Sequence, residues 1–122
     1  MATIDITEKT FDETITDNSI VLVDFWAGWC GPCRMFAPTF TAASEKHPEI
    51  VFAKVDTEAE QGLAAAAGIR SIPTLMAFRD KVLVFSQPGA LNAASLDEVI
   101  AGVQNLDMAA VHASVAAQQA SA

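Results

Sequence analysis

The sequence predicts an α/β domain in which helices cover both faces of a mixed sheet of about five strands. The 122 residues are 52% hydrophobic and 18% charged, a composition typical of one globular domain. A nearly continuous apolar run at residues 20–27 is typical of a strand that is buried on both faces. Strand and helix patterns also alternate along the chain in the order β-α-β-α-β-α-β-β-α, which favours this architecture.

The first half of the chain alternates between strand and helix patterns and justifies the first five elements. We expect them at residues 3–6, 7–16, 20–27, 33–46 and 50–55. Thr7 or Thr10 caps the first helix, since both are common N-cap residues. Residues 28–32 break the pattern after the central strand, and Pro38 inside the next helix predicts a kink.

The second half of the chain completes the domain. We expect a short helix, two strands and a final helix at residues 59–67, 74–78, 82–85 and 96–106. Gly68 ends the short helix, and the two strands form an antiparallel hairpin because very few residues separate them. A two-residue turn at Asp80 and Lys81 would need positive φ angles, which Lys adopts poorly, so the turn geometry stays open. Ser95 and Glu98 form a capping box at the start of the last helix.

The tail at residues 108–122 is rich in Ala and Gln. Met108, Val111 and Val115 have helical spacing, so the tail either extends the last helix or frays. We expect a domain at residues 1–107 and, at residues 108–122, a C-terminal extension without a catalytic role.

The charge and hydropathy of the chain exclude several classes of partner. Seven Lys and Arg against fifteen Asp and Glu give a net charge of −8. The basic residues are scattered, so nucleic acid is not an expected partner. No apolar run approaches the ~20 residues of a membrane helix, and the first residues lack the basic and apolar regions of a secretory signal. We therefore expect a cytoplasmic protein that does not bind membranes.

The two cysteines, Cys30 and Cys33, stand where the central strand meets the next helix. Their spacing suits redox chemistry or half of a metal site, but His47 and His112 lack the paired spacing of a zinc site. A reactive cysteine needs a stabilised thiolate and access to solvent. Cys30 precedes the helix, where backbone N–H groups and the helix dipole favour an anion.

Cys33 lies one helical turn beyond Cys30 and should be less exposed. We therefore expect Cys30 to attack a substrate disulfide and Cys33 to resolve the mixed disulfide. Gly31 allows a tight turn between them, and Pro32 suits the first turn of a helix. Two buried structural cysteines are the alternative interpretation.

Asp24 interrupts the most apolar strand of the chain. A buried carboxyl group has a raised pKa, and such a group behind the cysteines could accept the proton of Cys33. An aspartate at the strand edge that points to water fits the periodicity equally well. Lys54 either supports Asp24 electrostatically or is an ordinary solvated lysine. Trp29 could form an apolar docking surface, whereas Trp26 fits core packing.

The segment at residues 23–34, VDFWAGWCGPCR, strongly resembles the active-site segment of the thioredoxin family. Further similar segments follow in the expected order at residues 37–38, 53–56, 68–74 and 88–90. Arg34 stands where the family often has Lys and keeps the positive charge. The resemblance extends over roughly residues 3–107 and implies a thioredoxin fold with four helices around the sheet.

The resemblance also implies roles for individual residues. Asp24 is buried and transfers a proton, with Lys54 near it as electrostatic support. The Ile72–Pro73 peptide bond is cis. A docking surface for extended substrate chains comprises Trp29, Gly31, Pro32, Ile72, Pro73 and Gly89.

The resemblance implies partners as well: disulfide-bonded proteins as substrates, and a thioredoxin reductase, an NADPH-dependent flavoprotein, that returns electrons. The chain has no Gly-rich dinucleotide fingerprint, so we expect no bound cofactor beyond the cysteine pair, no metal, and a monomer.

The predicted function is protein-disulfide reduction, which maintains redox homeostasis in the cytosol. A disulfide-forming oxidant or isomerase shares the fold, but commonly carries His where this chain has Pro32. An interaction subunit or chaperone that uses the docking surface without redox chemistry is the non-enzymatic alternative.

Overall fold

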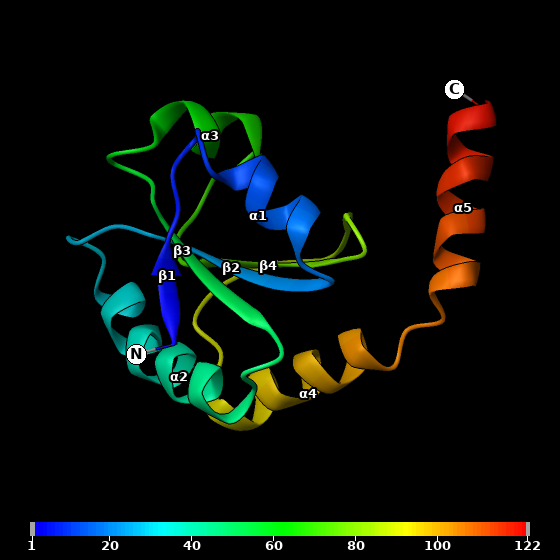
Figure 1. Cartoon of the computed structure of the whole chain (residues 1–122). Coiled ribbons are helices and arrows are strands. Elements are labelled where there is room, and N and C mark those ends of the chain that lie inside the picture. Colours follow the sequence, from blue (N-terminus) through cyan, green and yellow to red (C-terminus); the bar gives the residue numbers. More distant parts are fainter. Residues whose placement is uncertain (1, 122) are drawn as a thin grey trace.

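The computed structural model describes residues 2–121, in which a five-stranded sheet lies between two layers of helices (Figure 1). The strand order is β1-β3-β2-β4-β5. The strands are β1 (Thr3–Asp5), β2 (Ile20–Trp26), β3 (Val51–Asp56), β4 (Thr74–Arg79) and β5 (Val82–Pro88). The first three strands run parallel, whereas β4 is antiparallel to β2 and β5 is antiparallel to β4. The predicted mixed α/β sheet is confirmed.

The helices divide between the two faces of the sheet. Helices α1 (Phe11–Asp17) and α3 (Gln61–Ala66) cover one face, and α2 (Gly31–Lys46) and α4 (Ala93–Gln104) cover the other (Figure 1). These are the four predicted helices. The tail adds a fifth, α5 (Met108–Ser121), which projects to one side beyond the end of α4 (Figure 1).

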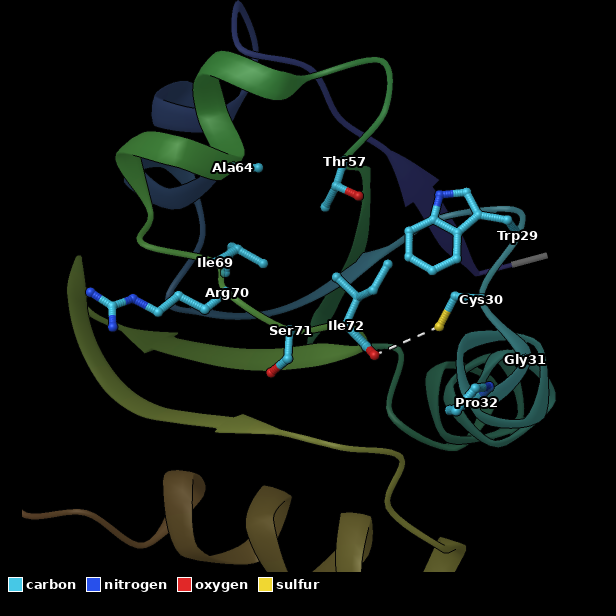
Figure 2. A pocket seen from close by; sticks show the side chains of 10 residues that line it. All are labelled: Trp29, Cys30, Gly31, Pro32, Thr57, Ala64, Ile69, Arg70, Ser71 and Ile72. Atoms are coloured by element: carbon cyan, nitrogen blue, oxygen red, sulfur yellow. Dashed lines mark hydrogen bonds between the residues drawn. The ribbon is translucent and has the colours of Figure 1, made fainter.

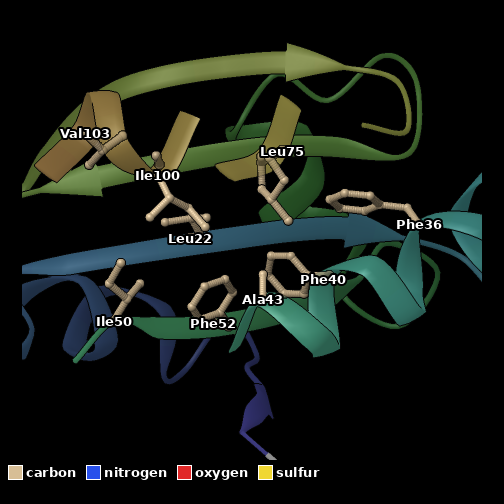
Figure 3. Close-up of a cluster of buried hydrophobic side chains, with 11 residues drawn as sticks. Leu22, Phe36, Phe40, Ala43, Ile50, Phe52, Leu75, Ile100 and Val103 are labelled. Atoms are coloured by element: carbon tan, nitrogen blue, oxygen red, sulfur yellow. The ribbon is translucent and has the colours of Figure 1, made fainter. Parts of the chain in front are cut away.

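The central strand β2 fills both halves of the core. Alternate side chains point to opposite faces of a strand, and those of β2 are almost all fully buried. Leu22 packs with α2 and α4 in a cluster that includes Phe40 and Phe52 (Figure 3). Val23 and Phe25 pack on the opposite face, with Ile15 of α1 among their neighbours. This double burial explains why the β2 sequence is almost continuously apolar.

All four predicted helix starts differ from the structure by two to four residues; α3, for example, begins at Gln61 instead of residue 59. Helix α2 begins at Gly31, two residues before the predicted position. Helix α1 begins at Phe11 with Thr10, one of the two predicted caps, as its N-cap residue, although the Thr10 Oγ1 accepts a hydrogen bond from the Thr7 N–H, outside the helix. The capping box that was predicted at Ser95 is wrong, because Asn92 caps α4 and its side chain accepts a hydrogen bond from the Ser95 N–H. An Asn side chain satisfies this N–H as well as a Ser hydroxyl would.

The β4–β5 hairpin closes through a tight turn. Asp80 and Lys81 have φ angles of 49° and 72°, the left-handed conformation that such a turn requires. The Asp80 N–H also donates a hydrogen bond to the Ser19 carbonyl at 2.8 Å, which attaches the turn to the segment before β2. The chain therefore forms the two-residue turn although neither residue is glycine.

Candidate active site

The cysteine pair lies at the junction between β2 and α2. Cys30 is the N-cap residue of α2, with extended backbone angles, and Gly31 and Pro32 form the start of the helix. Pro is favourable there because its missing N–H would have no helical partner. Cys30 and Cys33 are joined by a disulfide, with their Cα atoms 5.2 Å apart. The Cys33 backbone N–H donates to the Cys30 Sγ at 3.2 Å, a bond that would stabilise a thiolate at this atom.

A groove of about 430 Å³ opens beside Cys30 (Figure 2). Cys30 is one of its lining residues, and Cys33 is not. The exposed fractions of the two residues, 4% and 3%, do not separate them, so the predicted difference in exposure is not found. What distinguishes them is position, because the groove gives an incoming sulfur atom access to Cys30 alone.

The loop before β4 forms the wall opposite Cys30. The Ile72–Pro73 peptide bond is cis, as the resemblance implied. The Cys30 Sγ lies 3.6 Å from the Ile72 carbonyl oxygen, and Figure 2 shows the sulfur directed toward it. The Gly89 N–H donates to the Pro73 carbonyl at 2.8 Å, and Gly89 has a φ of 105°, which suits glycine.

The residues expected to dock substrates surround this loop. Trp29, Gly31, Pro32 and Ile72 all line the groove, and Trp29 is 68% exposed. Pro73 and Gly89 lie beyond its lining, attached to Ile72 through the peptide bond and to each other through the hydrogen bond.

Five further residues line the groove that the sequence did not single out as site residues. They are Thr57, Ala64, Ile69, Arg70 and Ser71. Thr57 directly follows β3 and donates from both its N–H and its Oγ1 to the Trp26 carbonyl, at 2.8 and 3.0 Å. The three residues before Ile72 could have been included from their position alone, whereas Thr57 and Ala64 reach the groove only through the packing of β3 and α3.

Asp24 is completely buried in the middle of β2. It lies on the same strand face as Leu22, the face that α2 covers. Neither carboxyl oxygen has a hydrogen-bond partner among the described residues. Burial raises the pKa of Asp24 to about 7, and the positive charge of Lys54 partly opposes the rise. Of the two alternatives for Asp24, the structure therefore has the buried one.

Lys54 is the register partner of Asp24 on β3. The Lys54 Nζ lies 5.0 Å from the centre of the Trp26 ring, within the range of a cation–π contact. It forms no ion pair with Asp24 in the described part of the chain. Lys54 is therefore close enough to act on the Asp24 charge without pairing with it.

Arg34 supports the loop before Cys30. Its Nη1 donates a hydrogen bond to the Gly28 carbonyl at 2.8 Å. The planar guanidinium of Arg reaches such carbonyls with a fixed donor geometry that Lys lacks. Arg34 thus attaches the exposed loop that carries Trp29 to the first turns of α2.

Groups that could hold a metal ion and membrane-spanning helices are both absent from the described residues. Within residues 2–121, no three His, Cys, Asp or Glu side chains are grouped so that they could hold a metal ion. Over the same residues, no helix has the length and apolar character needed to cross a membrane.

The fold and the cysteine pair define a thiol–disulfide oxidoreductase. The thioredoxin family model matches residues 2–102, and the chain belongs to the thioredoxin family. A Streptomyces coelicolor protein with the provisional name thioredoxin 2 is 54% identical over 121 residues, which are 99% of this chain and 90% of that protein. Thioredoxin C-3 of Corynebacterium nephridii is 43% identical over 78% of this chain and 66% of its own length.

Solved structures agree with this assignment. A thioredoxin variant from Halobacterium salinarum superposes with a TM-score of 0.78 and 34% identity, over 85% of this chain and 91% of that one. The recognition of the family from the sequence and the predicted thioredoxin fold are both confirmed.

Proposed function

We propose that the chain is a general protein-disulfide reductase in which Cys30 is the attacking nucleophile and Cys33 the resolving thiol. The observation that carries the proposal is the environment of the Cys30 sulfur. It accepts the Cys33 N–H at 3.2 Å at the start of α2, and it lines a groove that Cys33 does not reach. A thiolate at that atom is favoured by the helix N-terminus and can meet a substrate.

The first step forms a mixed disulfide. The Cys30 thiolate attacks one sulfur of the substrate disulfide, the substrate S–S bond breaks, and its second sulfur leaves as a thiolate. An extended substrate chain would lie on the surface formed by Trp29, Gly31, Pro32, Ile72, Pro73 and Gly89. The apolar lining and the exposed Trp29 ring support this placement.

The second step releases the product. Asp24 takes the proton of the Cys33 thiol, and the resulting thiolate attacks the Cys30 sulfur. The mixed disulfide breaks, the second substrate thiolate leaves, and the Cys30–Cys33 disulfide forms, so that two electrons have passed to the substrate. A carboxyl group whose pKa is about 7 suits this transfer, since it holds and gives up a proton near neutral pH.

The cycle needs a partner that returns two electrons to the disulfide. We propose an NADPH-dependent flavoprotein of the thioredoxin reductase type, because the chain has no dinucleotide fingerprint of its own. We further propose that the protein acts in the cytosol as a monomer and maintains redox homeostasis. Pro32, which stands where disulfide-forming relatives commonly carry His, supports the reducing direction.

The test is insulin reduction together with the trapping of mixed disulfides. Wild-type protein should reduce insulin disulfides with NADPH and a reductase, and Cys30→Ser should be inactive. Cys33→Ser should retain the first step and accumulate covalent adducts with substrate proteins, which dithiothreitol releases. Cys30→Ser is the matched control and should trap nothing, and adducts that form through Cys33 in that variant would contradict the assignment.

A further inference from the structure

Trp26, Asp24 and Lys54 lie on one face of the sheet. Trp26 ends β2 and follows Asp24 by two positions, so the two side chains project in the same direction. Lys54 is the register partner of Asp24 on the neighbouring strand, and its Nζ lies over the Trp26 ring at 5.0 Å from the centre. The carboxyl group, the ammonium and the indole face thus occupy neighbouring places beneath α2.

The indole contacts the ammonium with its ring face. The Nε1 of Trp26 is buried and has no hydrogen-bond partner in the described part of the chain. Buried Trp N–H groups usually have such a partner. Lys54, for its part, forms no ion pair with a described carboxylate. The attraction between a cation and the ring face is therefore the polar interaction that holds the Lys54 head group.

We propose that Trp26 is a positioning residue for proton transfer at Asp24: its indole face keeps the Lys54 ammonium beside the buried carboxyl group without letting the two form an ion pair. The inference rests on the proposed role of Asp24 as the acceptor of the Cys33 proton. Asp24 has few neighbours that could take over this function. Its partner on β4 is the apolar Leu75, and Lys54 is the one charged side chain among the described residues that shifts its pKa.

The consequence of losing the indole follows from the properties of lysine. The ammonium is strongly hydrated and sits on a flexible stem, so without the ring it would extend toward water. Its electrostatic effect on Asp24 falls as the distance grows. The ionised carboxylate would then lose support, and Asp24 would accept and release its proton at a higher pH.

The experiment is an NMR titration of the Asp24 carboxyl carbon in the oxidised protein, where the cysteines do not ionise. We expect Trp26→Leu to move the titration midpoint upward by about half a pH unit or more, because the carboxylate loses the electrostatic support of Lys54. Lys54→Met should move it at least as far. Trp26→Phe, which keeps an aromatic face, should restore most of the wild-type value and also guards against a fold defect in the leucine variant.

Two controls separate positioning from packing. Adding Trp26→Leu to Lys54→Met should produce no further shift, since the ring then has no charge to hold. Trp29→Leu is the same exchange at an exposed tryptophan without a contact to Lys54, and it should leave the midpoint unchanged. A midpoint in Trp26→Leu that stays or falls, or an equal shift in the Lys54→Met background, would overturn the proposal.

The titration is independent of turnover, which distinguishes the two hypotheses. If Cys33→Ser traps no substrate, the proposed function fails, whatever the titration gives. If trapping succeeds, the pH profile for resolution of the mixed disulfide should move upward in Trp26→Leu by the same amount as the Asp24 midpoint.

Discussion

Asp24 is a carboxyl group that is buried from solvent, and no described residue donates a hydrogen bond to it. Its pKa of about 7 compares with an ordinary value of 3.8. At a pH well below 3.8 the folded and unfolded chains are both protonated at this position, so the burial of a charge does not lower the stability of the folded state. As the pH rises from 3.8 to about 7, the unfolded chain releases a proton that the folded chain retains. The folded state therefore loses stability until the pH passes about 7.

Asp24→Asn should therefore stabilise the oxidised protein in a pH-dependent way. The amide is neutral at every pH, so we expect the variant to be more stable at pH 8 by up to ~4 kcal/mol, with a gap that closes as the pH approaches 4. Urea unfolding of the two proteins at several pH values measures this difference. Asp5→Asn, at an exposed position of β1, is the control and should show no such pH dependence. A gap for Asp24→Asn that stays constant with pH would contradict the assignment.

The sequence predicted the chemistry of single residues better than their surroundings. The Cys30–Cys33 spacing is local, and its position between a strand and a helix was enough to indicate redox chemistry. The burial of Asp24 was undecided, because an apolar strand with one aspartate fits two orientations. Its partner Lys54 is 30 positions away in sequence, and only the parallel register of β2 and β3 places the two side by side.

At the scale of elements, the first turn of α3 is capped by a carboxylate from another part of the chain. The Glu8 Oε1 accepts the Leu63 N–H at 2.9 Å, and the Glu8 N–H donates to the Glu60 Oε1 at 2.9 Å. A Cβ added at Gly62 would be too close to the Glu8 Oε1 for both to keep their places. The glycine leaves room for this cap, which spans 55 residues of sequence and could not be predicted from it.

Gly62→Ala should therefore have an effect that depends on Glu8. Alanine gains about 1 kcal/mol of helix propensity over glycine, but it displaces the carboxylate and loses a charge-assisted bond of about the same worth. We expect little net change in the wild-type background and about 1 kcal/mol of stabilisation in Glu8→Ala. Denaturant unfolding of the four proteins measures the coupling. Gly102→Ala in α4, where a Cβ meets only open space, should stabilise both backgrounds equally. An equal effect of Gly62→Ala in both backgrounds would exclude the clash.

The C-terminal end of helix α4 is capped by the side chain of Arg79, which belongs to β4. The Arg79 Nη1 donates to the carbonyls of Val103, Gln104 and Leu106 at 2.8, 2.9 and 3.0 Å. These carbonyls lie at the C-terminal end of α4 and just beyond it, where backbone acceptors have no helical partner and a positive charge is favourable.

Arg79→Met keeps the stem of the side chain but removes the donor, and it should destabilise the protein by about 2–3 kcal/mol. Arg79→Lys should recover part of the loss, since a single ammonium cannot reproduce the guanidinium geometry. Thermal unfolding and amide hydrogen exchange near the end of α4 measure the effect. The exposed Arg70 provides the matched exchange, Arg70→Met, which should cost much less. Equal losses at the two positions would mean that the three hydrogen bonds contribute nothing.

The element boundaries illustrate what local patterns cannot decide. Asn92 and Ser95 are both good N-cap residues, but the sequence favours Ser95 because Ser95 and Glu98 together match a capping box. The structure uses Asn92, which lets Leu96 reach the core cluster from the second turn of the helix. Tertiary packing thus overrode the cap that the local sequence favoured.

At the scale of the whole molecule, the order of elements was predictable because the apolar residues of each helix and strand follow a clear periodicity. A doubly buried β2 demands a layer of helices on each face, and the two clusters of buried side chains supply it. The groove was not predictable in full, since its lining comes from the loop after β2, the start of α2, the residue after β3, helix α3 and the loop before β4. Residues such as Thr57 and Ala64 reach it only once these elements are packed.

The tail at residues 108–120 contributes no side chain to the hydrophobic core. No side chain of residues 108–120 is buried, the family model ends at residue 102, and α5 projects beyond α4 (Figure 1). The similarity to the Streptomyces coelicolor protein nevertheless covers 99% of the chain, so the tail has a counterpart there. The domain that carries the cysteine chemistry should therefore be complete without α5.

A chain that ends at Asp107 should fold and act like the full protein. It keeps the Leu106 carbonyl that Arg79 binds and loses no buried side chain, so we expect a melting temperature within about 2–4 °C, the shift that corresponds to less than 1 kcal/mol, and unchanged insulin reduction. A chain that ends at Val99 is the informative contrast. It lacks Ile100 and Val103 of the core cluster, and the loss of two fully packed side chains should unfold it. Lower stability or activity of the chain that ends at Asp107 would instead make α5 an integral part of the domain.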